Sequence, residues 1–150
     1  MKYVGADYHK EFVTICVQGS RGKVLEIFEL PATCDGMDEL IMRMGDDNWM
    51  IMGETSGYSI NLHNYLLVSG INSKLVDPAN LKLITKSDIK TDKNDATVIA
   101  TFLRLMDKGE ISLSISYIVS GNQRDLRDLC RYRETASMLK GQCHQRISAH

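Results

Sequence analysis

Four acidic residues stand where the carboxylates of an α/β protein can gather. Asp7 follows a short β-prone segment, and Glu54 follows a strongly apolar one. Asp92 and Asp95 are three residues apart at the expected start of a helix, so both side chains can project from one face. Mg²⁺ takes oxygen ligands, and two ions roughly 3.5–4 Å apart can stabilise the attacking and leaving oxygens of a phosphodiester exchange. Such a set of acids is sufficient to hold two Mg²⁺ or Mn²⁺ ions.

Each of these acids also has a simpler interpretation. Asp7 alone is typical of the acids that end many strands, and Glu54 could cap the helix that follows it. Asp92 and Asp95 could be first-turn acids that interact with the helix dipole. Asp88, four residues before Asp92, is a rival ligand. Spacing alone therefore leaves the metal site as one of several hypotheses.

The elements that position these acids follow from the hydrophobic pattern. β-branched and apolar runs bounded by turn residues predict strands at residues 3–7, 12–17, 23–30, 49–53 and 71–76. Helical spacing of apolar residues predicts helices at 35–44, with Asp35 as cap, and at 60–67, 91–108 and 122–150. Two hairpins followed by alternating strands and helices indicate an α/β fold, a mixed sheet with helices on its faces.

Charge divides the chain into two regions. Residues 122–150 carry six basic and three acidic side chains, a net charge of +3, whereas the whole chain has a net charge of −1. The first 121 residues therefore carry −4, and a near-neutral total does not exclude a nucleic-acid partner. We expect a catalytic domain at residues 1–120 and the start of a helical, coiled-coil-like region at 121–150, which we expect to be truncated because the helix pattern reaches the last residue.

Four motifs resemble those of one protein family. In order, they are Gly5-Ala6-Asp7-Tyr8-His9-Lys10, Glu54-Thr55-Ser56-Gly57-Tyr58, Val76-Asp77-Pro78 and Lys90-Thr91-Asp92-Lys93-Asn94-Asp95-Ala96. They resemble the N-terminal DEDD domain of the insertion-sequence 110 (IS110) type transposases, a family that includes the Piv DNA invertases. The resemblance implies a RuvC-like, RNase H-like mixed sheet with flanking helices, followed by a long C-terminal helix.

The resemblance also implies an activity. Asp7, Glu54, Asp92 and Asp95 match the family's four acids, which are thought to bind Mg²⁺ for DNA strand cleavage and exchange during transposition. Several members are reported to use a structured guide RNA. Family members continue into a second domain that supplies a serine thought to attack DNA. Nothing in this chain matches that domain, so we expect this fragment alone to be incomplete as a recombinase.

Basic residues near the acids and in the last helix are candidate nucleic-acid contacts. They are Lys86, Lys90, Lys93, Arg124, Arg127 and Arg131. The lysines could equally form a solvated face, and Asp125 and Asp128 between the arginines favour surface ion pairs instead. The apolar stripe of the last helix predicts self-association into a homo-oligomer, although its mixed composition does not define a register.

Three other functions compete with the transposase hypothesis. They are a stand-alone RuvC-like junction resolvase, a non-catalytic nucleic-acid-binding or assembly module, and, more distantly, an actin-like ATPase. No apolar run approaches the ~18 residues of a membrane helix, and the N-terminus has no signal-peptide core, so we expect a cytoplasmic protein without a membrane partner. The four scattered cysteines indicate reduced, partly buried thiols rather than a disulfide or zinc site.

Overall fold

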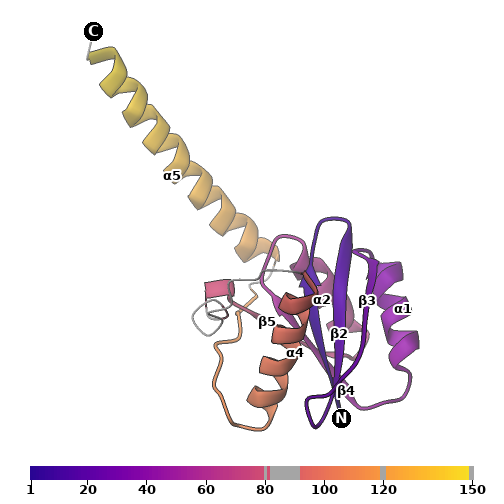
Figure 1. The fold of residues 1–150 in the computed structure, drawn as a ribbon. Helices are drawn as coiled ribbons and strands as arrows, with labels where there is room; N and C mark the ends of the chain where they lie inside the picture. The colour runs from indigo at the N-terminus through magenta and orange to yellow at the C-terminus, as the bar shows by residue number, and fades with distance from the viewer. Residues whose placement is uncertain (80, 82–91, 119–120, 149–150) are drawn as a thin grey trace. The chain divides into compact units, whose positions relative to one another are not determined.

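The computed structural model of the chain describes residues 1–79, 81, 92–118 and 121–148 (Figure 1). The chain consists of two compact units, Met1–Ser116 and Tyr117–His150. The first unit contains the whole sheet and three of the described helices, and the second contains one long helix.

Five strands form a mixed sheet. They are β1 (Lys2–Tyr8), β2 (Phe12–Gly19), β3 (Val24–Pro31), β4 (Trp49–Glu54) and β5 (Asn72–Val76), in the spatial order β3-β2-β1-β4-β5. The first three strands are antiparallel neighbours, whereas β4 pairs parallel to β1 and β5 pairs parallel to β4. The five predicted strands and the mixed character of the sheet are confirmed, and β1 occupies the centre.

Helices cover both faces of this sheet. α4 (Asp92–Asp107) lies on one face, whereas α1 (Cys34–Met44) and α2 (Ser59–Val68) lie on the other (Figure 1). The expected cap of α1 is wrong by two residues: the Thr33 side chain, not Asp35, accepts the hydrogen bond from the Gly36 N–H, at 3.2 Å. Asp35 lies within the first turn.

The contact between α4 and β1 is unusually close. A Cβ atom on Gly5 would lie 2.0 Å from the Ala96 carbonyl oxygen and 2.5 Å from the Ala100 nitrogen. Only glycine therefore allows the two backbones this approach. Beside the contact, an apolar cluster fills the space between helix and sheet: Tyr3, Met50, Met52, Val76, Leu81, Ile99, Phe102 and Leu103. Glycine at one position and bulky side chains at its neighbours thus hold α4 in place on the sheet.

The second unit is α5 (Gly121–Ser148). Its apolar side chains are exposed, including Leu129 at 67% and Leu139 at 52%. Among the cysteines, Cys16 is buried, whereas the expectation of partial burial is wrong for Cys34, Cys130 and Cys143, which are exposed. In the described part of the chain, no helix combines the length and apolar character needed to cross a bilayer.

Candidate active site

The register of the central strands places Asp7 and Glu54 side by side. Ala6 of β1 lies opposite Gly53 of β4 in a parallel pair, so Asp7 and Glu54 are the next residue on each strand. Alternation directs both side chains to the face that Gly5 presents to α4. Neighbouring strands lie about 4.8 Å apart, which brings the two carboxylates within reach of a shared cation.

α4 brings its N-terminal end to the same place. Ala96 and Ala100 lie over Gly5, whereas Asp107 at the other end of α4 accepts a 2.7 Å hydrogen bond from the Tyr3 hydroxyl. The helix therefore runs antiparallel to β1, and its first turn lies at the carboxyl end of β1, where Asp7 stands.

Two of the predicted ligands come from that first turn. Asp95 is partly buried there, and Asp92 is the first residue of α4, although its side chain is outside the described residues. The rival acid Asp88 is outside them too. Among the described side chains, no group of three His, Cys, Asp or Glu is arranged to hold a metal ion. That set lacks the Asp92 carboxylate, so the four-acid assignment stays a prediction.

His9, which is not among the predicted site residues, contacts Asp7. Its Nε2 lies 3.1 Å from Asp7 Oδ2, and its ring packs on Phe12 with 4.5 Å between ring centroids. The His9 N–H also donates to the Phe12 carbonyl oxygen at 2.9 Å. The His9 ring is therefore a close neighbour of the Asp7 carboxylate at the end of β1. The signal in the sequence was the spacing Asp-x-His at a strand end.

Hydrogen bonds connect Thr55, the residue after Glu54, to the last residue of the first unit. Thr55 Oγ1 lies 2.6 Å from Ser116 Oγ and 3.2 Å from the Val76 carbonyl oxygen. The Ser116 N–H donates to the Leu75 carbonyl oxygen at 2.8 Å. These bonds fix the backbone on which Glu54 stands and connect it to the segment that leads out of the unit.

Two serines make the hydrogen bonds at the start of α2, the helix that follows Glu54. The N–H of Ser56 donates to Ser59 Oγ at 2.8 Å, and the N–H of Ser59 donates to Ser56 Oγ at 3.1 Å. The N-cap residue of α2 is Tyr58, which makes no side-chain capping bond. The alternative role of Glu54 as the cap of this helix is therefore wrong.

The predicted nucleic-acid contacts are only partly described. Lys86 and Lys90 lie outside the described residues, as do the side chains of Lys93 and Arg124 on α4 and α5. Arg127 and Arg131 are exposed on α5. Arg131 lies 3.6 Å from Asp128, an exposed pair of the kind that contributes little stability.

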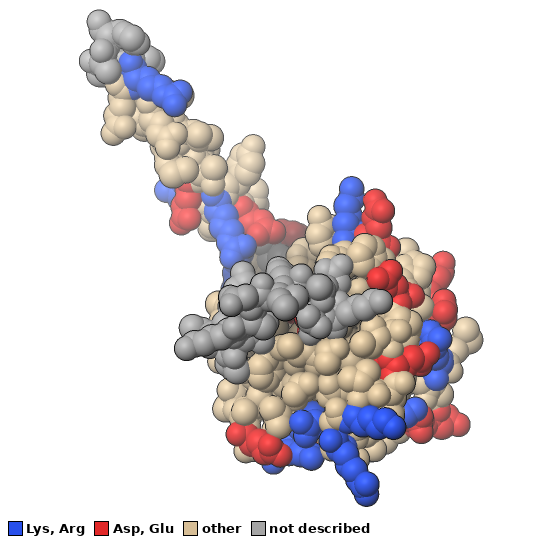
Figure 2. All heavy atoms as spheres, in the orientation of Figure 1, with Lys and Arg blue, Asp and Glu red and all other residues tan. Residues whose placement is uncertain are grey.

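Charge is unevenly distributed over the visible face of the first unit. Figure 2 shows Lys and Arg gathered along its lower edge, where Figure 1 places the N-terminus, and Asp and Glu mainly on the upper and right-hand sides. The lower edge holds the amino end of β1. Cationic side chains visible on this face are therefore concentrated at the end of the sheet opposite to Asp7.

Known proteins resemble both the sequence and the fold. The family model of the IS110 type DEDD transposases, described as a transposase, matches residues 4–150. The transposase for insertion sequence element IS1533 of Leptospira borgpetersenii is 27% identical over 150 residues, which cover 97% of this chain and 42% of that protein. The chain thus spans less than half the length of this relative.

Two solved structures show which fold this is. T. thermophilus RuvC in complex with Holliday junction substrate has a TM-score of 0.54 at 12% identity, over 76% of this chain and 100% of that one. A second Thermus thermophilus RuvC structure has a TM-score of 0.54 at 13% identity, over 77% of this chain and 100% of that one. The first unit therefore has the RuvC-like, RNase H-like fold that the sequence predicted, and the second supplies the predicted C-terminal helix.

Proposed function

The chain belongs to the IS110 type family of DEDD transposases, and from this premise we propose that residues 1–120 form a Mg²⁺-dependent catalytic domain for DNA strand cleavage and exchange. Residues 121–150 form the start of the helical region that follows. The proposal rests above all on the alignment of Asp7 and Glu54 at the ends of two adjacent parallel strands, at the end of the sheet where α4 begins. Ligands of open α/β sheets bind at this edge.

Four carboxylates from three elements would hold the metal. Asp7 and Glu54 come from β1 and β4, and Asp92 and Asp95 come from the first turn of α4. When bound, two Mg²⁺ or Mn²⁺ ions supply charge stabilisation to the attacking and leaving oxygens of the phosphodiester. The chain's own contribution is position: the N-terminal dipole of α4 lowers the repulsion among the acids, and His9 lies beside Asp7 with 3.1 Å between Nε2 and Oδ2.

Substitution of Asp7 tests this proposal. We expect Asp7→Asn to weaken Mn²⁺ binding by more than tenfold and to abolish Mg²⁺-dependent cleavage, since the variant loses a ligand but keeps its shape. Asp38→Asn is the matched control, because Asp38 lies on α1 at the opposite face and accepts a hydrogen bond from Tyr65. Titration calorimetry with Mn²⁺ measures both variants. Equal Mn²⁺ affinity in Asp7→Asn and the parent chain would contradict the proposal.

We propose DNA and a structured guide RNA as partners. The contacts are the basic residues named above, Lys86, Lys90, Lys93, Arg124, Arg127 and Arg131. Loss of one phosphate contact reduces the salt dependence of binding by about one unit of slope. We expect this for Arg127→Ala, and not for Arg43→Ala, because Arg43 pairs with Glu26 at 2.9 Å and stacks on Phe28.

We also propose that α5 mediates self-association. Its apolar residues recur at intervals of three and four: Leu129, Tyr132, Ala136, Leu139 and Cys143. Since the described ones are exposed, a second copy can bury them. Leu139→Glu should convert an oligomer to a monomer in sedimentation equilibrium, whereas Met42→Glu, at an exposed site on α1, should not.

The RuvC neighbour bound to a Holliday junction favours one alternative, a junction-cleaving activity. A preference for four-way junctions over duplex DNA of equal length would support it. A non-catalytic binding module remains the other alternative, and it predicts that Asp7→Ala leaves nucleic-acid binding intact and abolishes no cleavage.

A further inference from the structure

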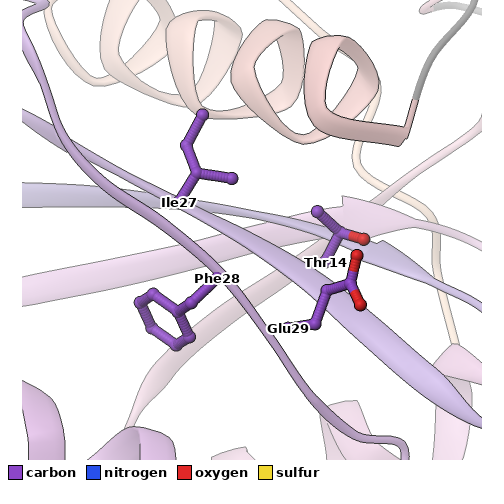
Figure 3. A pocket seen from close by; sticks show the side chains of 4 residues that line it. All are labelled: Thr14, Ile27, Phe28 and Glu29. Atoms are coloured by element: carbon purple, nitrogen blue, oxygen red, sulfur yellow. The ribbon is translucent and has the colours of Figure 1, made fainter.

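A small pocket lies on the face of β3 that α4 leaves open. Its volume is about 240 Å³, and it is lined by Thr14, Ile27, Phe28 and Glu29. Figure 3 shows Thr14 and Glu29 side by side, with Ile27 along the strand and the Phe28 ring directed to the other side. Two polar groups and one apolar wall therefore define the pocket.

Strand register connects this pocket to the candidate active site. Glu29 of β3 pairs with Thr14 of β2, and Thr14 pairs with Asp7 of β1. The three side chains share one face in a transverse row, because directly paired residues project to the same side. With about 4.8 Å between strands, Thr14 lies roughly 5 Å and Glu29 roughly 10 Å from the position of Asp7. A nucleotide next to a phosphate held at Asp7 reaches this row.

The polar groups of the pocket have unused hydrogen-bonding capacity. Thr14 is fully buried, and its hydroxyl has no hydrogen-bond partner among the described residues. Glu29 is exposed and forms no ion pair with any residue that the structure describes. A buried hydroxyl without a partner is unfavourable because it has lost its hydrogen bonds to water. A ligand that satisfies it recovers that cost.

The chemistry of Thr14 and Glu29 indicates which part of a nucleotide the pocket can bind. A carboxylate repels phosphate, so the occupant is an uncharged part of the nucleotide. Ile27, 37% exposed, offers an apolar surface that a base can contact. A carboxylate accepts hydrogen bonds from an exocyclic amino group, as Glu does with the N4 amino group of cytosine. In cytosine and adenine a ring nitrogen acceptor adjoins that amino group and matches a hydroxyl donor such as Thr14.

We propose that this pocket binds a nucleobase beside the scissile phosphate, with Glu29 accepting from the amino group of cytosine or adenine and Thr14 donating to the adjacent ring nitrogen. The inference rests on the proposed function only for the position of the scissile phosphate near Asp7, whereas the base itself contacts Glu29 and Thr14 and requires no metal. It adds a specificity-determining subsite to a catalytic centre that would otherwise contact only the backbone of the strand.

Binding of short single strands to the 150-residue chain tests this subsite. The probes are pentamers of deoxycytidine, deoxyadenosine and thymidine, in EDTA, with the Ile27 methyl signal followed by NMR. We expect the deoxycytidine or deoxyadenosine pentamer to bind about five- to tenfold more tightly than the thymidine pentamer and to shift the Ile27 methyl. The stronger of the two identifies the base.

Variants separate base recognition from charge. Glu29→Gln should remove the preference, because an amide can pair with either an amino or a carbonyl edge, and Thr14→Val should reduce it. Glu26→Gln removes an equal charge from the opposite face of β3, where Glu26 pairs with Arg43, and should leave the preference unchanged. Equal affinity for the three pentamers, an unchanged Ile27 methyl, or no binding at all would overturn the proposal.

The readout is independent of the metal. Asp7→Asn should lose Mn²⁺ binding and keep the base preference, whereas Glu29→Gln should keep Mn²⁺ binding and lose the base preference. If the parent chain binds no Mn²⁺ but prefers one base, the proposed catalysis fails and the subsite stands.

Discussion

Replacement of Gly5 by alanine tests how the close packing of α4 on β1 supports the acids. The added Cβ would lie 2.0 Å from the Ala96 carbonyl oxygen and 2.5 Å from the Ala100 nitrogen. Both are backbone atoms of α4, so no side-chain rotation relieves the clash. The helix must move away from β1 by more than 1 Å, and Asp92 and Asp95 at its first turn move with it.

The expected cost follows from overpacking. Inserting a methyl into a well-packed interior costs about 1–3 kcal/mol, and we expect the upper part of that range because the obstructing atoms are backbone. For a unit of this size, about 3 kcal/mol corresponds to a melting temperature lower by roughly 10 °C. A displacement of about 1 Å also spoils metal coordination, whose ligand distances are defined to within about 0.2 Å.

Gly36→Ala provides a matched control. A Cβ at Gly36 would lie 2.1 Å from the Pro31 carbonyl oxygen, a clash of the same severity, but on the α1 side of the sheet. Thermal unfolding and Mn²⁺ titration are measured on both variants. We expect a similar loss of melting temperature in each, and at least tenfold weaker Mn²⁺ binding only in Gly5→Ala.

Two results would refute this reasoning. An unchanged melting temperature in Gly5→Ala would show that α4 does not pack on β1 as described. Equal losses of Mn²⁺ affinity in Gly5→Ala and Gly36→Ala would show that the metal site responds to overall stability and not to the position of α4.

Three further outcomes concern stability. Burial lowers the pKa of His63 below its ordinary value of 6.5. As the pH falls, the unfolded chain therefore binds a proton at this histidine before the folded chain does. The contribution of His63 to the free energy of unfolding is complete above about pH 6.5 and is lost as the pH falls below that value. The decrease in melting temperature from about pH 7.5 to 5.5 should shrink in His63→Asn and persist in His144→Asn. Thr33→Ala should cost about 1 kcal/mol in urea unfolding because it removes the α1 cap, whereas Asp35→Asn should cost only a few tenths. Gln18→Leu should change the free energy of unfolding by less than about 1 kcal/mol in the same assay. The substitution loses the two hydrogen bonds that the Gln18 amide nitrogen donates, but it also removes a buried amide oxygen that has no partner among the described residues, and the two effects offset each other.

The strands and the two strand-end acids were predictable because their determinants are local. Apolar and β-branched runs ended by turn residues define β1, β2 and β4, and the carboxyl ends of parallel neighbours meet at one edge of the sheet. Asp7 and Glu54 were therefore found together from sequence alone. Asp92 and Asp95 were placed by helix periodicity, which located the start of α4 but not the distances among the four acids.

The remaining features depend on partners distant in the chain. In the sequence, Thr14 is one β-branched residue of a predicted strand. Only the strand register shows that its side chain lies in one row with Asp7 and Glu29 across the sheet. Gly5 carried a signal, since a glycine inside a strand pattern often marks a close backbone approach. The exposure of Ile27 follows from the edge position of β3, which no local pattern encodes.

The central claim is that Asp7, Glu54, Asp92 and Asp95 converge on one divalent-metal site. Crystals of the chain soaked in Mn²⁺ test it most directly through anomalous diffraction. We expect one or two Mn²⁺ peaks within about 2.3 Å of carboxylate oxygens from β1, β4 and the first turn of α4. Carboxylates of Glu54 or Asp92 that point to a surface away from Asp7, or Mn²⁺ bound by other residues in their place, would contradict the claim.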